Sequence, residues 1–327
     1  MINRLTFQPH RIIMQSHFET PILFLIFNRP DTTKIVFDQL SKARPKRLFV
    51  AADGPRETVA GEKEKCEATR KIISQVDWDC EVKTLFRNEN LGCGPAISSS
   101  IGWFFSEVEE GIILEDDCFP DLSFLPYCQE LLHKYREVDK VKLIGGNNFQ
   151  GGIARGNGSY YFSHYPEIWG WASWRRAWLQ YDFEMIDFEE ARVAGVLHEI
   201  FKTTKERKYW YQKFLQTKTG EINTWDYQLT YCILKNKGIA ITPQINLVKN
   251  IGLYNNPTHK SLVDSKKAPD VSSISFPLIH PPMIVDTMAD QFTFSQIYAK
   301  SFRRIMRLIK ENGVRRFLSY SFNHLFK

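Results

Sequence analysis

The first half of the chain alternates between two kinds of segment, and this alternation constrains the fold more than any other feature. Short apolar runs end in polar or glycine-rich turns, and each run is followed by a stretch with helical spacing. The expected strands are 22–27, 47–52, 81–86, 112–114 and 141–144, and the expected helices are 32–42, 62–75, 96–107 and 123–136. Strands that alternate with helices form a largely parallel sheet with helices on its faces. The sequence therefore predicts an α/β fold, in which ligands bind beyond the carboxyl ends of the strands.

Three consecutive acids, Glu115, Asp116 and Asp117, directly follow the fourth apolar run. Carboxylates this close repel one another and resist desolvation, so they persist at the edge of a core when a cation or strong donors lie nearby. A Mg²⁺ or Mn²⁺ ion, held by one or two carboxylates together with water and phosphate oxygens, would satisfy them. Acidic triplets at strand ends are also often solvated turns or helix caps. The triplet alone leaves both interpretations open.

Polar residues also follow the first three expected strands. Arg29 can bridge phosphate oxygens or stack on a base, and Asp53 can accept a hydrogen bond from a base or a ribose hydroxyl. Asn90 opens a segment that leads into a helix, whose N-terminus could favour an anion. Each residue alone could equally be an ordinary turn or capping residue. Their common position after strands predicts one donor-binding rim.

Length and composition are those of an ordinary globular protein. The 327 residues, 43% apolar and 24% charged, allow one large domain or two small ones. No apolar stretch approaches the roughly 20 residues that cross a bilayer. The first 20 residues lack the continuous apolar centre of a signal peptide, so a cytoplasmic location is expected. The six cysteines show no metal-ligand spacing and are expected to be free thiols.

Positive charge is concentrated near the C-terminus. Residues 300–327 contain eight Lys and Arg and one Glu, so they account for the formal net charge of +6 and leave the rest close to neutral. A nearly neutral body argues against a nucleic-acid-binding protein. Apolar residues interleave with the basic ones at helical spacing, and two hypotheses stay open. The helix either docks on an anionic membrane surface, at about 1 kcal/mol per basic residue, or packs on the domain.

Aromatic residues are concentrated between residues 165 and 178, which contain four of the eight tryptophans. Flat aromatic faces suit the apolar faces of sugar rings, and Trp169 and Trp171 are the candidates for such a pocket. Aromatic clusters more often form core, so both interpretations stay open. Asn147, after the fifth expected strand, could line a sugar or acceptor pocket or serve the backbone turn.

Taken in order, these residues resemble the GT-A nucleotide-sugar glycosyltransferases, a Rossmann-like fold. The chain resembles N-acetylglucosaminyltransferase I and bacterial hemolysin-like sugar transferases, over residues 21–253. The run 21–29 looks like that family's first strand, and the resemblance implies that Arg29 contacts the nucleotide and Asp53 the uracil. It further implies that Asp117 binds Mn²⁺ through the donor diphosphate, while Glu115 and Asp116 face the ribose and the sugar.

The resemblance continues in the second half. A Gly-Trp pair follows the substrate pocket in this family, as Gly170 and Trp171 do here. A Trp-Asp segment supplies the base that takes the acceptor proton, which implies that role for Asp226. The family motif has two adjacent acids, whereas Tyr227 occupies the second place, and helix capping by Asp226 is the alternative. Some sugar transferases use a late histidine as a metal ligand, which makes His259 a further candidate.

The resemblance predicts a Mn²⁺- or Mg²⁺-dependent inverting glycosyltransferase of the hexosyltransferase class. It would move a sugar from a UDP-linked donor to a glycan or lipid-linked glycan acceptor, in bacterial surface polysaccharide synthesis. The alternatives are a sugar nucleotidyltransferase and a catalytically silent glycan-binding or nucleotide-sugar-binding protein. The expected organisation is an N-terminal extension (1–17), a GT-A domain (18–262), an irregular linker (263–295) and a basic amphipathic helical tail (296–327). That tail would place a cytoplasmic enzyme on the inner face of the membrane.

Overall fold

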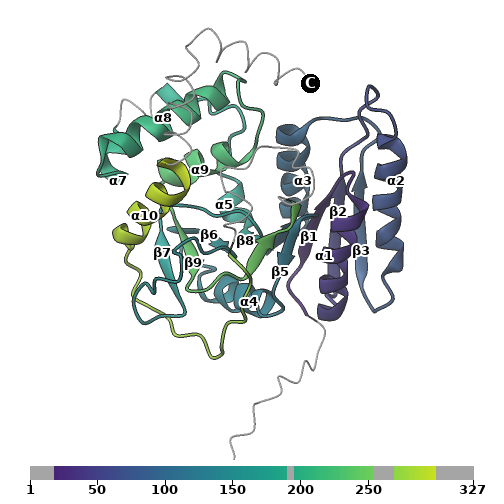
Figure 1. Ribbon diagram of the computed structural model, residues 1–327, viewed down its shortest axis with the longest axis horizontal. Coiled ribbons are helices and arrows are strands. Elements are labelled where there is room, and N and C mark those ends of the chain that lie inside the picture. Colours follow the sequence, from purple (N-terminus) through teal and green to yellow (C-terminus); the bar gives the residue numbers. More distant parts are fainter. Residues whose placement is uncertain (1–17, 190–194, 253–268, 300–327) are drawn as a thin grey trace, which may run out of the picture.

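The computed structural model describes residues 18–189, 195–252 and 269–299, which form two sheets with helices around them (Figure 1). The larger sheet has eight strands in the order β3-β2-β1-β4-β8-β6-β9-β7. These are β1 (Ile22–Ile26), β2 (Arg47–Ala52), β3 (Glu81–Phe86), β4 (Glu110–Glu115), β6 (Val141–Gly145), β7 (Tyr160–Ser163), β8 (Trp171–Trp174) and β9 (Ile239–Pro243). The smaller sheet pairs β5 (Cys118–Pro120) with β10 (Val248–Asn250) in antiparallel orientation. The predicted α/β class, with a mostly parallel sheet flanked by helices, is confirmed.

The helices confirm the predicted alternation in the first half. They are α1 (Pro30–Ala43), α2 (Glu62–Ile72), the 3₁₀ turn η1 (Ile73–Gln75), α3 (Cys93–Glu107), α4 (Phe124–Lys134), α5 (Arg175–Trp178), α7 (Val196–Ile200), α8 (Thr204–Lys218), α9 (Asp226–Lys235), α10 (Thr287–Thr293) and the π-helical turn η4 (Phe294–Tyr298). The predicted strand and helix bounds in residues 22–145 differ from these by three residues at most.

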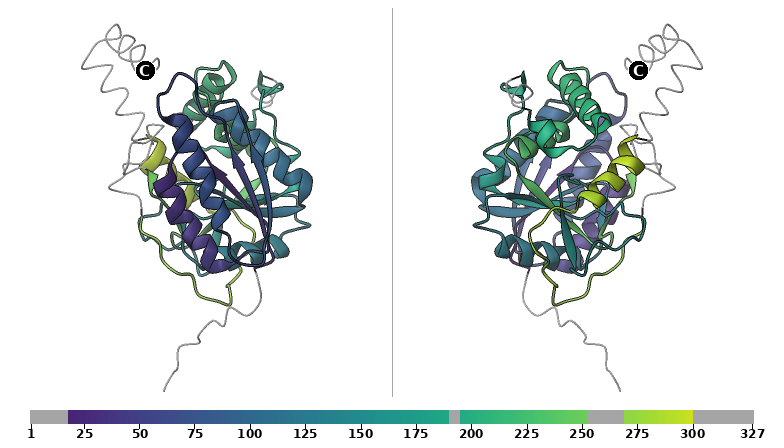
Figure 2. Two further views of the ribbon diagram at one scale, coloured as in Figure 1. Left: turned by 90° about the vertical axis from the view of Figure 1, so that its right-hand side faces the viewer. Right: turned by 90° about the vertical axis from the view of Figure 1, so that its left-hand side faces the viewer.

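The central strand β1 shows why helices cover both faces of the sheet. Successive side chains of a strand point to opposite faces. Ile22, Phe24 and Ile26 pack in one apolar cluster with α1, α2 and α4, whereas Leu23 and Leu25 pack in another with α3, α5 and α9. All five side chains are buried. The two further views show the resulting layers, with the sheet between helices (Figure 2).

The register of the parallel strands brings the predicted rim segments together. Leu25 pairs with Glu115, and Ile26 pairs with Ala52. Ala52 pairs in turn with Phe86. The segments that follow β1, β2, β3 and β4 therefore leave the sheet at the same edge, as the sequence pattern predicts. We call this edge the carboxyl edge.

Strand β8 was not expected, and it extends the carboxyl edge into the second half of the chain. It runs antiparallel between β4 and β6, and Trp171 pairs with both Ile113 and Gly145. Residues 167–170, which precede β8, therefore lie beyond the end of β4. Because β9 runs parallel to β6, the segment after Pro243 reaches the same edge.

Residues 269–299 pack on the domain, whereas an irregular linker was expected over 263–295. Ile274 and Leu278 are buried in the main apolar cluster. Asp286 begins α10 by accepting a hydrogen bond from the backbone N–H of Ala289 at 2.8 Å. This cap lies in a polar stretch, which explains why the apolar spacing did not reveal the helix. The extension 1–17 and the tail from residue 300 lie outside the described residues.

Two further expectations concern the described part of the chain as a whole. None of its helices is long and apolar enough to cross a membrane. All six cysteines are free, as predicted, and four of them are buried.

Candidate active site

The acidic triplet at the end of β4 is held against Arg29, the N-cap residue of α1, which ends the turn after β1. A guanidinium N–H of Arg29 donates to Asp117 Oδ2 at 2.7 Å, and the same nitrogen lies 3.6 Å from Asp116 Oδ1. The backbone N–H of Phe27 donates to Asp116 Oδ2 at 3.2 Å. Asp116 and Asp117 are buried. The structure therefore brings together Arg29 and the acidic triplet, which the sequence placed on one rim.

The small sheet positions the other side of Asp117. Asn250, at the end of β10, donates from its amide to Asp117 Oδ1 at 3.2 Å, and the N–H of Ile251 donates to the Asp117 carbonyl at 2.8 Å. Gly252 passes so close that a Cβ built on it would lie 2.4 Å from Asp117 Oδ2. Only glycine allows this approach without displacing the carboxylate. The turn 250–252 thus fixes the orientation of Asp117.

Electrostatics in the triplet favour a cation. Burial raises the pKa of both Glu115 and Asp116, and the charges of the neighbouring acids raise them further. Burial opposes the charge of Arg29, but Asp116 and Asp117 outweigh it, so the pKa of Arg29 is raised. One guanidinium therefore faces three carboxylates. The raised pKa values mean that these carboxyls hold their protons more tightly than usual, and a cation beside them would favour the ionised forms.

Asp226, the predicted base, lies across from the triplet at the start of α9. Its charge contributes to the raised pKa of Glu115 and of the Cys93 thiol. Asp226 Oδ1 accepts hydrogen bonds from the Thr224 hydroxyl and, at 2.9 Å, from the backbone N–H of Tyr227. Trp225, and not Asp226, occupies the N-cap position. Asp226 is therefore not the N-cap. It lies in the first turn of α9, where the helix dipole favours an acidic side chain.

The loop before α9 reaches the carboxyl edge by packing on the N-terminus of α3. The backbone N–H of Gly94 donates to Asn223 Oδ1 at 3.2 Å. A Cβ on Gly94 would lie 2.7 Å from the Thr224 carbonyl, so glycine is needed for this contact. The N-terminus of α3, expected to favour an anion, is thus partly satisfied by Asn223. This contact places Asp226 beside Cys93, whose pKa is raised to about 12 by burial and by nearby acids.

Asp53 and Asn90 lie together, and their hydrogen bonds mainly connect the two loops that contain them. The Asp53 carboxylate accepts from the Asn90 amide at 3.0 Å and from the backbone N–H groups of Gly54, Leu91 and Gly92 at 3.0–3.1 Å. Asn90 also donates to the Gly54 carbonyl at 2.7 Å. The sequence predicted that Asp53 accepts from a base. In the structure, its oxygens connect the loop after β2 to the loop before α3.

Two of the predicted pocket residues, Asn147 and Trp171, are buried in the protein interior. Asn147 is buried, accepts from the Trp169 backbone N–H at 2.9 Å and donates to the Val248 carbonyl at 3.0 Å. Trp171 is 1% exposed and stacks on Trp225 at a centroid distance of 5.8 Å. The expectation that Trp171 lines a sugar pocket is therefore corrected, because its position in β8 points it into the core.

Trp169 is the predicted aromatic that stays partly exposed. It packs edge-on against Phe149 at a centroid distance of 5.3 Å. Since it precedes β8, it lies at the carboxyl edge beyond the end of β4. Trp169 can therefore form one wall of the site, whereas Trp171 cannot.

Four residues of this region were not singled out from the sequence. Asn250 and Asn223 orient Asp117 and the Asp226 loop. Burial raises the pKa of Glu167 to about 8, and the described residues provide no hydrogen bond or ion pair for its carboxylate. Lys213, on α8, lies within range of the Asp226 charge. Of these four residues, only Asn250 could have been suspected from the sequence, because it stands two residues before Gly252. The others depend on contacts between distant segments.

The described residues contain no group of three His, Cys, Asp or Glu side chains placed to hold a metal ion by themselves. A bound divalent cation would lower the raised pKa values of Glu115 and Asp116, so the chemistry of the triplet fits such an ion. His259, the other predicted ligand, lies outside the described residues.

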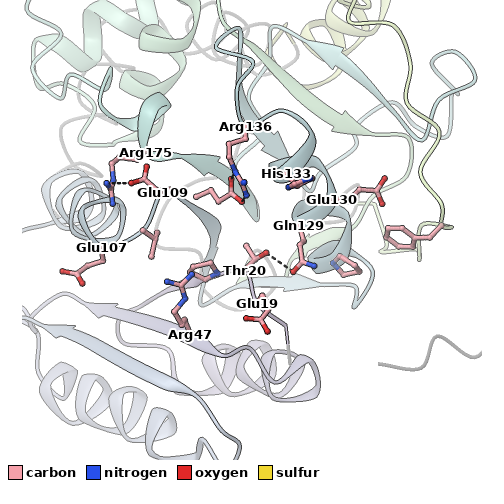
Figure 3. Close-up of a pocket in the computed structure, with 15 residues that line it drawn as sticks. Glu19, Thr20, Arg47, Glu107, Glu109, Gln129, Glu130, His133, Arg136 and Arg175 are labelled. Carbon is pink, nitrogen blue, oxygen red and sulfur yellow. Dashed lines mark hydrogen bonds and ion pairs between the residues drawn. The ribbon is translucent and has the colours of Figure 1, made fainter. Parts of the chain in front are cut away.

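A separate cavity of about 950 Å³ opens at the opposite edge of the sheet (Figure 3). Its lining includes Arg47 and Glu110, the first residues of β2 and β4. Arg136 pairs with Glu110 at 2.6 Å, and Arg175 pairs with Glu109 at 2.5 Å. None of the predicted site residues lines this cavity. It lies at the amino ends of the strands, where α/β sheets do not usually bind ligands.

No protein-family model matches the chain, and no curated protein matches its sequence. Solved structures with a partial likeness include HddC from Yersinia pseudotuberculosis, at 12% identity and a TM-score of 0.29, covering 48% of this chain and 77% of HddC. Another is 4-diphosphocytidyl-2C-methyl-D-erythritolsynthase from Anaerococcus prevotii DSM 20548, at 10% identity and a TM-score of 0.30, covering 60% and 84%. A third is mouse xyloside xylosyltransferase 1, at 10% identity and a TM-score of 0.33, covering 67% and 82%.

Proposed function

We propose that the protein is a metal-dependent inverting glycosyltransferase of the GT-A type. It would move a sugar from a nucleotide-diphosphate donor, UDP-linked, to a hydroxyl of a glycan acceptor. One observation carries the proposal: the acidic triplet, paired with Arg29, shares the carboxyl edge with Asp226, which stands on a separate helix. The arrangement offers a cation and phosphate site on one side and a base on the other.

On the donor side, Asp117 would hold the divalent cation, Mn²⁺ or Mg²⁺, and Glu115 and Asp116 would face the ribose and the sugar. The support is that three crowded carboxyls face the single guanidinium of Arg29, so that a cation would favour their ionised forms. When bound, such a cation supplies electrostatic stabilisation of the departing diphosphate. Arg29 would turn from Asp117 toward the phosphate oxygens, which compete for its N–H donors. The loops joined by Asp53 and Asn90 would hold the base and ribose.

On the acceptor side, Asp226 would act as general base. The acceptor oxygen forms its bond to the anomeric carbon while the bond from that carbon to the diphosphate oxygen breaks. The proton of the acceptor hydroxyl passes to Asp226. Attack from the face opposite the leaving group inverts the configuration. The hydrogen bonds from Thr224 and from the Tyr227 backbone keep the carboxylate in one orientation.

The cellular setting is a further part of the proposal. The basic residues of 300–327 would hold the enzyme on an anionic membrane surface, where a lipid-linked glycan acceptor of a bacterial surface polysaccharide would be found. Deletion of residues 300–327 should then release the protein from the membrane fraction. Unchanged fractionation would contradict this part alone.

The donor site is tested by thermal unfolding with UDP-sugars, GDP-sugars, nucleoside triphosphates and NAD, each with and without Mn²⁺. A ligand that binds the folded state raises the unfolding temperature. We expect a Mn²⁺-dependent rise with a UDP-sugar, lost in Asp117→Ala. A rise with NAD alone would overturn the proposal. Release of pyrophosphate from a nucleoside triphosphate and a sugar phosphate would indicate a nucleotidyltransferase instead.

The base is tested by Asp226→Asn. This variant should keep donor binding and lose turnover by about 10²–10⁴-fold, the usual contribution of a general base. Transfer at a near wild-type rate would show that another group takes the proton. Donor binding without release of diphosphate by the wild-type protein, for any acceptor, would indicate a silent binding protein.

A further inference from the structure

Lys213 lies on the acceptor side of the site, on a helix that packs against the helix of Asp226. Helices α8 and α9 are in contact, and Lys213 Nζ lies 5.9 Å from the centre of the Tyr227 ring. Tyr227 directly follows Asp226 in α9. The charge of Asp226 acts on Lys213 and favours its protonated form. Within the part of the chain that the structure describes, Lys213 is therefore a lysine whose charge interacts with that of the candidate base.

Lys213 differs from the other half-buried lysine on these two helices, because no ion pair holds it among the residues that the structure describes. Lys235, on α9, pairs with Asp187 at 2.8 Å. Within the described ranges, Lys213 has no carboxylate within ion-pair distance, and its ammonium donates only to Gln216 Oε1 at a long 3.4 Å. Burial lowers its pKa, with the charge of Asp226 opposing this. A partly desolvated ammonium without a counter-ion is costly to the folded state.

Such a group has two explanations. A lysine can bury its apolar stem while its charge stays in water, which requires no ligand. Alternatively, a ligand supplies the missing anion, because ionisable groups with perturbed pKa values cluster at functional sites. The position beside Asp226 favours the second explanation. An acidic acceptor would be repelled by Asp226 and the triplet, and a nearby ammonium would offset that repulsion.

We propose that Lys213 binds an anionic group, a carboxylate or a phosphate, on the acceptor sugar whose hydroxyl faces Asp226. The proposal rests on the proposed function, since Asp226 defines the acceptor side. It adds a substrate class: the acceptor is an acidic glycan, such as a uronic acid or a phosphorylated sugar. The cation–π contact with Tyr227 would keep the ammonium in place before the ligand binds.

The test uses the full-length protein and three probes: methyl β-glucuronide, glucose 6-phosphate and methyl β-glucoside. Binding is measured by calorimetry and ligand-observed NMR, with UDP and Mn²⁺ saturating so that the donor site cannot take the phosphate. We expect at least one anionic probe to bind about tenfold more tightly than the neutral glucoside, equivalent to about 1.4 kcal/mol. The preference should disappear in Lys213→Met and persist in Lys213→Arg.

The matched control is Lys208→Met, which removes an exposed lysine from the same helix. It should keep the full preference. Lys213→Gln serves as a second neutral variant should Lys213→Met unfold. Equal binding of all three probes by the wild-type protein would overturn the proposal, as would a preference that survives in a folded Lys213→Met. The glucuronide can be tested without UDP, so failure of UDP to bind would refute the proposed function and leave this result separate.

Discussion

Replacement of Asp53 by alanine tests whether this carboxylate is a loop connector. The change removes an acceptor used by the Asn90 amide and by the backbone N–H groups of Gly54, Leu91 and Gly92. Leu91 is exposed, so water can replace its bond. Hydrogen bonds to a charged group contribute about 1.5–3 kcal/mol each, and the remaining donors are only partly accessible to water. Allowing for partial rehydration, we expect the free energy of unfolding to fall by about 2–4 kcal/mol.

The assay is urea unfolding followed by tryptophan fluorescence, with the slope as well as the midpoint compared. Asp38→Ala is the matched control, because the Asp38 side chain is about half exposed, at 48%, and its carboxylate pairs with Lys34, one helical turn away. It should change stability by no more than about 0.5 kcal/mol. An Asp53→Ala protein as stable as the Asp38→Ala protein would refute the reasoning. Asp53 would then be available for a nucleotide base, as the resemblance implies.

Two other substitutions test the site in different ways. Gly252→Ala should displace Asp117, because the new methyl group would meet Asp117 Oδ2, and we expect weaker Mn²⁺-dependent donor binding and a stability loss of about 1–3 kcal/mol. Donor affinity equal to that of the wild type would contradict this. Gly102→Ala is the control, because a Cβ at Gly102 would meet only an ordinary contact, 3.6 Å from the indole nitrogen of Trp178. Glu167→Gln should alter the pH dependence of stability, because burial raises the pKa of Glu167 to about 8. The folded protein then binds a proton that the unfolded chain has released, so wild-type stability should fall as pH rises from about 4.5 to 8, and the variant should fall less; identical profiles in urea unfolding would argue against a buried carboxyl.

The donor half of the site could be predicted because it follows from local pattern. Apolar runs of β-branched and aromatic residues predicted the strands, and parallel register necessarily places their carboxyl ends together. The proximity of Arg29 to Asp117 therefore follows from two strand ends, although they are 88 residues apart. The mutual repulsion of the three carboxyl groups could also be inferred, because consecutive residues cannot move far apart.

The acceptor half could not be predicted in the same way. Strand β8 is only four residues long, and its aromatic sequence is compatible with either a pocket or a core. Trp169 and Trp171 are two residues apart, so a continuous strand would point both to the same face. They differ because β8 begins at Trp171, after Gly170 turns the chain in a left-handed conformation. Lys213 is an unremarkable lysine within its helix. Its proximity to Asp226 follows from the packing of α8 on α9, and these two helices share no sequence motif that would predict the contact.

The insertion of β8 between β4 and β6 has a mechanical consequence. Because β8 is hydrogen-bonded to both neighbours, the acidic triplet at the end of β4 and Trp169 before β8 belong to one continuous sheet. Strands in a sheet lie about 4.8 Å apart and cannot separate without breaking these bonds. The spacing between these two parts of the site is therefore set before any substrate arrives. Adjustment to substrates of different size must come from the loops above the edge, chiefly the loop before α9, the helix that begins with Asp226.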